Sequence, residues 1–186
     1  SIPGYTAMKR SAFKRKLNKP MKRTPLRKVS VRKTKPKKDL MPARVKRAKN
    51  KLYELSHTYI RKRDSAQSGV IAGYCCSCGA FCEGGNFQAG HYEPDSTGGA
   101  LLRYHPHNMH GQGGYCCNIT RNHKETVKVK YASFMYNKYG HEYVERLLSM
   151  KKKSIKADII FYEKMIELYE QGDESEIVKY LENLAG

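Results

Sequence analysis

The stretch CCSCGAFCEGGNFQAGHY covers residues 75–92, and the stretch GYCCN covers residues 114–118. Cys75 and Cys78 have C-x2-C spacing with Gly79 directly after them, which is the knuckle that presents two thiolates to one tetrahedral zinc ion. Cys116 and Cys117 lie further along the chain, at the start of an expected helix. Together the four thiolates would close a structural Zn²⁺ site, which would let a loop-rich region fold without a large core.

The fourth ligand of this site is open from the sequence alone. A second C-x2-C pair would need a cysteine at position 113 or 114, and both positions are glycine. The available substitutes are Cys116, Cys82 and His110, of which we favour Cys116. For Cys76 and Cys82 an ordinary buried thiol is an equally good interpretation.

The charge of the chain is concentrated at its N-terminal end. The 186 residues carry a formal net charge of +19, and residues 1–50, with 19 basic residues and one acid, account for +18 of it. Pro20, Pro25 and Pro36 interrupt this segment, and it has few large apolar side chains, so residues 1–42 are expected to be a disordered basic arm. Residues 1–7 differ from the arm in texture and are a candidate remnant of an expression vector.

Composition also limits the compartment. No apolar window reaches the length that a membrane span needs, and no apolar segment follows the N-terminal charges, so neither membrane insertion nor secretion is expected. Six cysteines in two groups fall short of a disulfide scaffold, and in a reducing compartment such groups are typical of metal ligands. A cytoplasmic protein is therefore expected.

Apolar side chains at helical spacing follow the arm. A helix from just after Pro42 to near Asp64 is predicted by Val45, Ala48, Leu52, Leu55 and Tyr59. Further helices are expected from Asn118 to Gly140, over 141–151, from Ser154 onward, and after an N-cap at Asp173. Short strands are expected over Val70–Tyr74 and Phe87–His91, and residues 93–115 are expected to be mostly loop.

Further motifs lie between and beyond the two cysteine groups. They are GH (90–91), GG (98–99), Asn108 and CN (117–118), and in this order they resemble the HNH, or His-Me finger, nucleases. The longer motifs FQAGHY (87–92), LRY (102–104), NMHGQ (108–112) and HK (123–124) resemble the NinG/Rap recombination nucleases of lambda-like phages. The resemblance covers about residues 50–145.

This resemblance implies a fold and an activity. The fold class would be α+β, with a small zinc-stabilised ββα-metal (HNH) core flanked by helices. Residues 43–152 would form the nuclease domain and residues 153–186 the C-terminal helices. The activity would be that of a metal-dependent endonuclease acting on branched recombination intermediates such as Holliday junctions and D-loops, in the cytoplasm of a bacterial host if a phage encodes the protein.

The resemblance also implies catalytic roles for particular residues. Phosphodiester hydrolysis needs a water made nucleophilic and a cation on the phosphate. His91 matches the position of the general base, and Asn108 matches the residue that orients or supports it. His91, Asn118 and His123 match positions around a catalytic Mg²⁺ or Mn²⁺, although His123 follows Cys117 at a longer spacing than the related sequences suggest.

One departure from the HNH pattern concerns the catalytic metal. Many HNH enzymes have an aspartate directly before the histidine as a metal ligand, and here that residue is Gly90. Glu93, Asp95 and His123 are the candidates to replace this ligand.

DNA is the expected partner of the basic residues, because an arm at +18 would release counterions on binding a duplex, without sequence choice. The residues expected to contact DNA are Lys14, Arg15, Lys22, Arg23, Arg27, Lys28, Lys46, Arg47, Arg61 and Arg63. Selectivity for branched DNA would have to come from shape, for instance through a homodimer that places two sites on two strands.

Two other functions compete with the nuclease. A non-catalytic, zinc-stabilised nucleic-acid-binding module would explain Gly90 as the loss of a metal ligand. An RNA-binding protein would explain the arm equally well, but it gives no reason for the arrangement of His91, Asn108 and Asn118.

Overall fold

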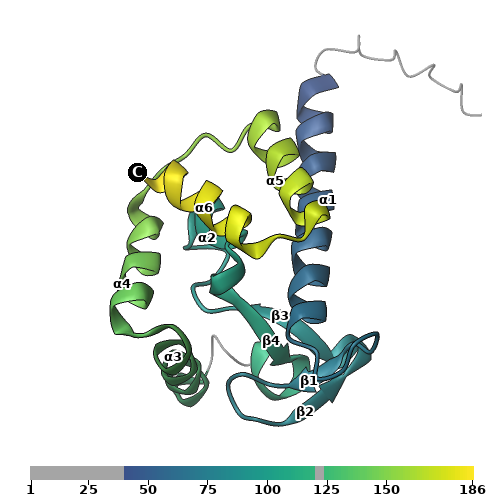
Figure 1. Ribbon diagram of the computed structural model, residues 1–186, viewed down its shortest axis with the longest axis vertical. Coiled ribbons are helices and arrows are strands. Elements are labelled where there is room, and N and C mark those ends of the chain that lie inside the picture. The colour runs from purple at the N-terminus through teal and green to yellow at the C-terminus, as the bar shows by residue number, and fades with distance from the viewer. Residues whose placement is uncertain (1–39, 120–123) are drawn as a thin grey trace, which may run out of the picture. The chain divides into compact units, whose positions relative to one another are not determined.

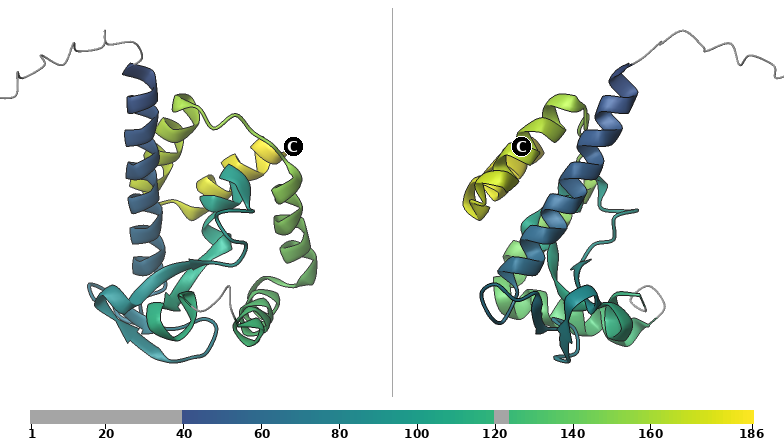
Figure 2. Two further views of the ribbon diagram at one scale, coloured as in Figure 1. Left: turned by 180° about the vertical axis from the view of Figure 1, so that it is seen from behind. Right: turned by 90° about the vertical axis from the view of Figure 1, so that its right-hand side faces the viewer.

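The computed structural model describes residues 40–119 and 124–186, so residues 1–39 of the expected arm and His123 lie outside the described residues. The first described element is helix α1 (Leu40–Arg63), which confirms the helix expected to end near Asp64. The boundary of the arm at residue 42 was wrong, because α1 begins at Leu40 and holds Pro42 in its first turn, where proline has no helical hydrogen bond to lose. The buried positions of α1 include Leu52, Ser56 and Ile60, which recur every fourth residue and so share one face. Helix α5 (Ile159–Gln171) packs along α1, as the two views of Figure 2 show.

Two short antiparallel hairpins follow α1. Strands β1 (Ala72–Tyr74) and β2 (Phe81–Glu83) pair with Tyr74 opposite Phe81, so their connection is the segment 75–80 that holds the cysteine knuckle. Strands β3 (Phe87–His91) and β4 (Met109–Gly113) form the second hairpin, with His91 opposite Met109. The hairpins lie at the end of α1 that carries Arg63 (Figure 1).

The prediction that residues 93–115 are mostly loop was wrong. This stretch contains helix α2 (Gly99–Arg103), the 3₁₀ turn η2 (Pro106–Asn108) and strand β4. Strand β4 escapes detection because its sequence, MHGQG, has no β-branched residue and does not alternate apolar with polar. All five of its residues are buried, and the polar side chains of His110 and Gln112 are accommodated by contacts from distant parts of the chain.

The helix expected from Asn118 starts later. Residues Gly114–Asn118 form a π-helical turn, η3, and helix α3 runs over Glu125–Tyr139. The order β3, β4, η3 therefore has a one-turn π-helix where the ββα core was expected to have its α-helix. The described residues show an α+β protein, and an HNH core stays a prediction.

The remaining helices are α4 (His141–Ser149), α5 and α6 (Glu174–Ala185). Asp158 caps α5, accepting hydrogen bonds from the backbone of Ile160 and Phe161, so α5 starts after the expected Ser154. Asp173 caps α6 as predicted. The main core lies between α1 and these helices; its largest fully buried side chains include Tyr104, Tyr131 and Leu52. Within the described ranges, no helix combines the length and apolar character that crossing a membrane requires.

Candidate functional site

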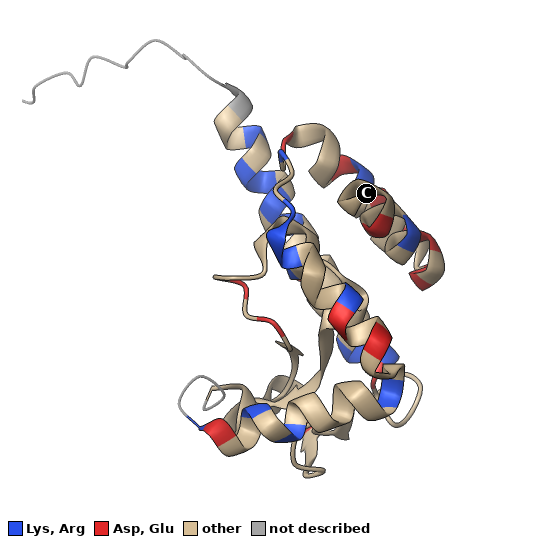
Figure 3. Ribbon diagram, turned by 90° about the vertical axis from the view of Figure 1, so that its left-hand side faces the viewer, with Lys and Arg blue, Asp and Glu red and all other residues tan. Residues whose placement is uncertain are grey.

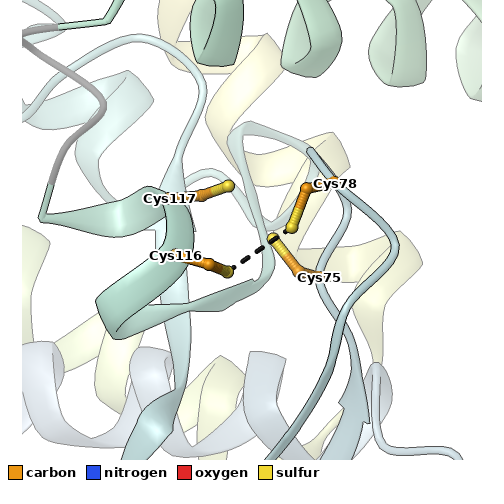
Figure 4. A group of neighbouring side chains, drawn as sticks. All are labelled: Cys75, Cys78, Cys116 and Cys117. Atoms are coloured by element: carbon orange, nitrogen blue, oxygen red, sulfur yellow. Dashed lines mark hydrogen bonds between the residues drawn. The ribbon is translucent and has the colours of Figure 1, made fainter.

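Four cysteines gather between the β1–β2 connection and η3. The sulfurs of Cys75, Cys78, Cys116 and Cys117 all lie within 4.8 Å of one another, and the Sγ atoms of Cys78 and Cys116 are 3.5 Å apart. Figure 4 shows the two pairs facing each other from opposite sides of a common centre. This is a donor set for one tetrahedral ion, and four sulfur ligands suit zinc. The structure thus brings together the four cysteines that the sequence analysis favoured.

The local backbone explains how the knuckle forms. The backbone N–H of Cys75 donates to the carbonyl of Ala80 at 2.8 Å, and the N–H of Gly79 donates to the carbonyl of Cys75 at 2.8 Å. Gly79 has φ +74°, which a residue with a side chain adopts only with strain. The turn therefore depends on glycine directly after the second cysteine.

Gly113 is one of the two positions where a second C-x2-C pair would need a cysteine, and it is packed against sulfur atoms. A Cβ at Gly113 would lie 2.4 Å from the Sγ of Cys116 and 2.6 Å from the Sγ of Cys82, so position 113 has no room for a cysteine. The adjacent pair Cys116–Cys117 takes its place because one π-helical turn directs both sulfurs to the knuckle. Among the described residues, neither Cys82 nor His110 belongs to the four-sulfur group.

His91 lies at the end of β3 and lines a cavity of about 480 Å³. The cavity lies between the α1 face, the β3 strand and η3, and it is lined by Tyr53, His57, Arg61, Gly85, Gln88, Ala89, His91, Asp95 and Asn118. Two residues expected in the catalytic centre, His91 and Asn118, therefore share one cavity. A third, Asn108, does not line it.

Contacts of the His91 ring determine which nitrogen can act as a base. Its Nε2 is 2.9 Å from the carbonyl oxygen of Arg103 and 2.9 Å from Oδ1 of Asp95. A carbonyl oxygen only accepts hydrogen bonds, so Nε2 carries the proton, and in the neutral ring Nδ1 has the lone pair. Nδ1 is then the atom that can take a proton from water.

Asp95 is a charged partner of this histidine. Burial alone would raise its pKa, but the hydrogen bond and charge of His91 and the charge of Arg103 outweigh burial and hold the pKa below its usual range. Asp95 is therefore ionised at neutral pH. It is the acid that lies beside His91, whereas the carboxylate of Glu93 pairs with Lys151 at 2.8 Å and Glu93 lines a different cavity.

Asn108 binds two backbone segments that adjoin His91, at Glu93 and Leu102. Its Oδ1 accepts from the backbone N–H of Glu93 at 2.8 Å, and its Nδ2 donates to the carbonyls of Glu93 and Leu102 at 3.1 and 2.9 Å. Asn108 is fully buried and clamps the segment after β3 to the end of α2, next to Arg103, whose carbonyl holds His91. A role of Asn108 in supporting a catalytic base stays a prediction.

Asn118 faces the same cavity from η3. Its Nδ2 donates to Oε1 of Gln88 at 2.7 Å, which leaves the carbonyl oxygen Oδ1 as the atom available to a cation. His123, the other residue expected here, lies outside the described residues.

Gly90 is a packing position rather than a lost ligand position. A Cβ at Gly90 would lie 2.1 Å from Oε1 and 3.0 Å from Cβ of Gln112, a fully buried side chain that donates to Ser77. The carbonyl of Gly90 also accepts a hydrogen bond from the buried Tyr131 hydroxyl at 2.7 Å. A side chain at position 90 would require Gln112 to shift, and the carboxylate beside His91 comes from Asp95.

Gly90→Ala is expected to destabilise the protein by about 1–3 kcal/mol, because the added methyl group must displace a buried side chain. Gly85→Ala is the matched control, since Gly85 lines the His91 cavity and a methyl group added there would meet no atom within 4 Å. This control should unfold close to the parent. Urea denaturation of both variants measures the difference, and equal midpoints would show that Gln112 moves aside freely.

Of the basic residues of α1, Arg61 and Arg63 have different surroundings. Arg61 lines the His91 cavity and donates to the carbonyl of Gly84 at 2.6 Å. The prediction that Arg63 contacts DNA is not supported, because its guanidinium is bound inside the protein by Asp64, Glu174 and the carbonyls of Pro106 and Met109. Lys46 and Arg47 are exposed on α1, where Lys and Arg gather toward its N-terminal end (Figure 3). The expected DNA contacts in the arm lie outside the described residues.

His57 is a site residue that the sequence analysis missed. Its ring centroid is 5.5 Å from that of His91, and burial, together with the charge of His91, lowers the pKa of His57 to about 4. The available signal was the spacing of Tyr53, His57 and Arg61, which recur every fourth residue and so share one face of α1.

Comparison with protein families agrees with the motifs in the chain. Residues 5–176 match the family model described as the bacteriophage lambda NinG protein. Searches of curated proteins and of solved structures returned no match. Since the family match extends over most of the 186 residues, the chain belongs to the NinG family.

Proposed function

We propose that this protein is a metal-dependent DNA endonuclease that cuts branched recombination intermediates by phosphodiester hydrolysis. The observation that carries the proposal is the His91 ring. Its Nε2–H is held by the Arg103 carbonyl, which leaves Nδ1 as the base, in a cavity shared with Asp95, Asn118 and Arg61.

The residues of the cavity divide the chemistry among them. Nδ1 of His91 takes a proton from a water molecule as that water attacks the phosphorus, and Asp95 stabilises the imidazolium that forms. Arg61 offers positive charge to the phosphate oxygens. Asn108 binds the carbonyl of Leu102, the residue before Arg103, and so helps to hold the backbone whose Arg103 carbonyl orients the imidazole.

A divalent cation fits the remaining donors. The carboxylate of Asp95 and the amide oxygen of Asn118 are oxygen ligands, which Mg²⁺ and Mn²⁺ prefer, and both residues line the cavity. Such an ion, when bound, supplies positive charge to the phosphate and the leaving oxygen. The four cysteines would hold Zn²⁺ with a structural role, since four protein ligands leave no open position.

The partner is inferred from charge and family. Residues 1–50 carry +18, which favours a polyanion and predicts steep salt dependence of binding. The choice of branched DNA rests on the resemblance to recombination nucleases of lambda-like phages. The packing of Gly90 against Gln112 gives a second explanation for glycine at this position, besides the loss of a metal ligand that the non-catalytic module assumes.

His91→Ala is expected to slow cleavage by about 10²–10⁴-fold, the contribution of a positioned general base. The measurement is single-turnover cleavage of a four-way DNA junction and a linear duplex in Mg²⁺ or Mn²⁺ by the full chain. His141→Ala is the control, because His141 is an exposed histidine stacked on Tyr136, and it should cleave like the parent. Cleavage by His91→Ala at the parent rate would refute the assignment of the base.

Junction binding without cleavage in either metal would favour the non-catalytic module, and equal affinity for duplex RNA would favour an RNA-binding protein.

A further inference from the structure

One face of α1 forms a wall of the His91 cavity. Tyr53, His57 and Arg61 stand four residues apart and all three line the cavity with His91. The rings of Tyr53 and His57 are 4.0 Å apart between centroids, so His57 is held between Tyr53 and His91.

Buried polar atoms without partners concentrate around this wall. In the described part of the chain, Nε2 of His57, Nε of Arg61 and Nε of Arg103 are buried and make no hydrogen bond. Oδ1 of Asp95 is buried in the same cavity, and its neighbour is Nε2 of His91, 2.9 Å away. Each arginine nitrogen is a donor, and the neutral imidazole of His57 offers one N–H. Unsatisfied buried donors are costly and call for a partner, and a group with several acceptor oxygens would satisfy them.

A second cavity continues the first along α1. It has a volume of about 340 Å³ and shares Tyr53 and Asp95 with the His91 cavity. Besides these two shared residues, the second cavity is lined by Lys49, Asn50, Glu54, Arg103 and Tyr104. From Lys49 to Arg61 the helix rises about 18 Å, which matches about five nucleotides of one strand of B-DNA.

We propose that His57 and Arg61 form the seat of the scissile phosphate, and that the strand to be cut lies along α1 from Arg61 toward Lys49. The proposal rests on the proposed nuclease function and names its substrate contacts. Arg61 supplies the charge and His57 a neutral donor, so two residues one turn apart contact the phosphate from the side of α1. Asp95 is the acid that lines both cavities, and its negative charge is offset by His91 and Arg103.

Arg61→Ala is expected to slow single-turnover cleavage of a four-way junction at saturating protein by about 10²–10³-fold, the scale of losing a donor to a developing charge. Lys62→Ala removes the same charge from the next residue of α1, which is exposed and does not line the cavity, and it should stay within about 3-fold of the parent. Because Arg61 also binds the Gly84 carbonyl, Arg61→Lys is included; it should recover part of the rate, and circular dichroism should show all three variants folded.

A readout without cleavage separates this proposal from the nuclease function. In the full chain labelled with ¹³C-histidine, the ring signal of His57, assigned by its loss in His57→Asn, is followed as a six-nucleotide single-stranded DNA is added. The signal should shift in the parent and Lys62→Ala proteins and stay in place in Arg61→Ala. A shift without cleavage of any DNA would support the seat and refute the nuclease function. Cleavage that depends on His91 but not on Arg61 or His57, with an unmoved His57 signal, would overturn the seat.

Discussion

Cys75→Ser is expected to lower the free energy of unfolding by more than about 5 kcal/mol and to abolish stoichiometric zinc binding. Structural zinc contributes about 10–16 kcal/mol in small zinc domains, which is as large as the whole net stability of a typical protein, about 5–15 kcal/mol. The region around the four cysteines has few other stabilising interactions. Its strands β1 and β2 have three residues each, and its buried cluster contains Phe87 and Val127 besides three cysteines. Urea denaturation and metal analysis of the purified variant measure both effects.

Cys76→Ser is the matched control for this experiment. Cys76 lies in the same knuckle, yet it is outside the four-sulfur group, and its sulfur contacts the hydroxyl of Ser77. This variant should keep one zinc ion per chain and most of its stability. If Cys75→Ser and Cys76→Ser unfold at the same urea concentration and bind equal zinc, the four cysteines are not a metal site.

Asp64→Asn is expected to cost about 3–5 kcal/mol, because it removes one of the two carboxylates that neutralise the buried Arg63 and leaves only Glu174. Asp64 receives two hydrogen bonds from Arg63, at 2.7 and 3.1 Å, and one from the backbone N–H of Gly111 at 2.7 Å. It therefore ties the end of α1 to β4, and through Arg63 and Glu174 the same network reaches α6. The control is Glu125→Gln, which breaks the exposed pair Lys128–Glu125 and should cost no more than about 1 kcal/mol. Equal costs would show that the network contributes nothing beyond a surface pair.

The same network makes stability depend on pH. Burial lowers the pKa of His105 to about 3 and that of His110 to about 4, whereas a histidine in an unfolded chain titrates near 6.5. The unfolded chain therefore takes up protons first, so stability should fall as the pH falls below about 6.5.

Two carboxylates add to this loss in more acidic solution. Burial alone would raise the pKa of Glu174, but its interactions with His107 and Arg63 lower this pKa to about 2. Burial alone would likewise raise the pKa of Asp64, but its interactions with His110 and Arg63 lower it. Their contribution is complete above about pH 4.3 and is lost as the pH falls toward 2. Denaturation from pH 7 to pH 3 should show a monotonic loss in the parent, and the slope below pH 4 should be smaller in Asp64→Asn. A stability maximum near pH 4 would contradict this account.

The predictions that the structure confirmed were those that depend on residue type and short spacing along the chain. The knuckle follows from Cys75, Cys78 and the glycine after them, and α1 follows from apolar residues at helical spacing. The cap of α6 follows from Asp173, whose carboxylate accepts a hydrogen bond from the backbone N–H of Ser175 in the first turn of that helix. Each of these features is decided within a few residues along the chain, where residue type and spacing are informative.

Long-range contacts decided what the sequence did not show. Strand β4 has no strand pattern, and its buried His110 and Gln112 are tolerated only because Asp64 and Ser77, more than thirty residues earlier, supply hydrogen bonds. Arg63 resembles its basic neighbours on α1, and only the folded chain places three elements around its guanidinium.

The sequence by itself determined the Cys75–Cys78 knuckle, the amphipathic helices and the concentration of charge in the first fifty residues, because each depends on residue type and short spacing. The choice of Cys116 over Cys82 and His110 as the fourth member of the cysteine group was decided by the folded chain. The tertiary structure decided which side chains share the cavity with His91. It put Asp95 beside the imidazole and showed that Gly90 faces Gln112. It also placed His57 and Arg61 in the cavity wall. The physical reason is that a site depends on distances between atoms from distant segments, and those distances exist only after α1, β3 and η3 have packed together.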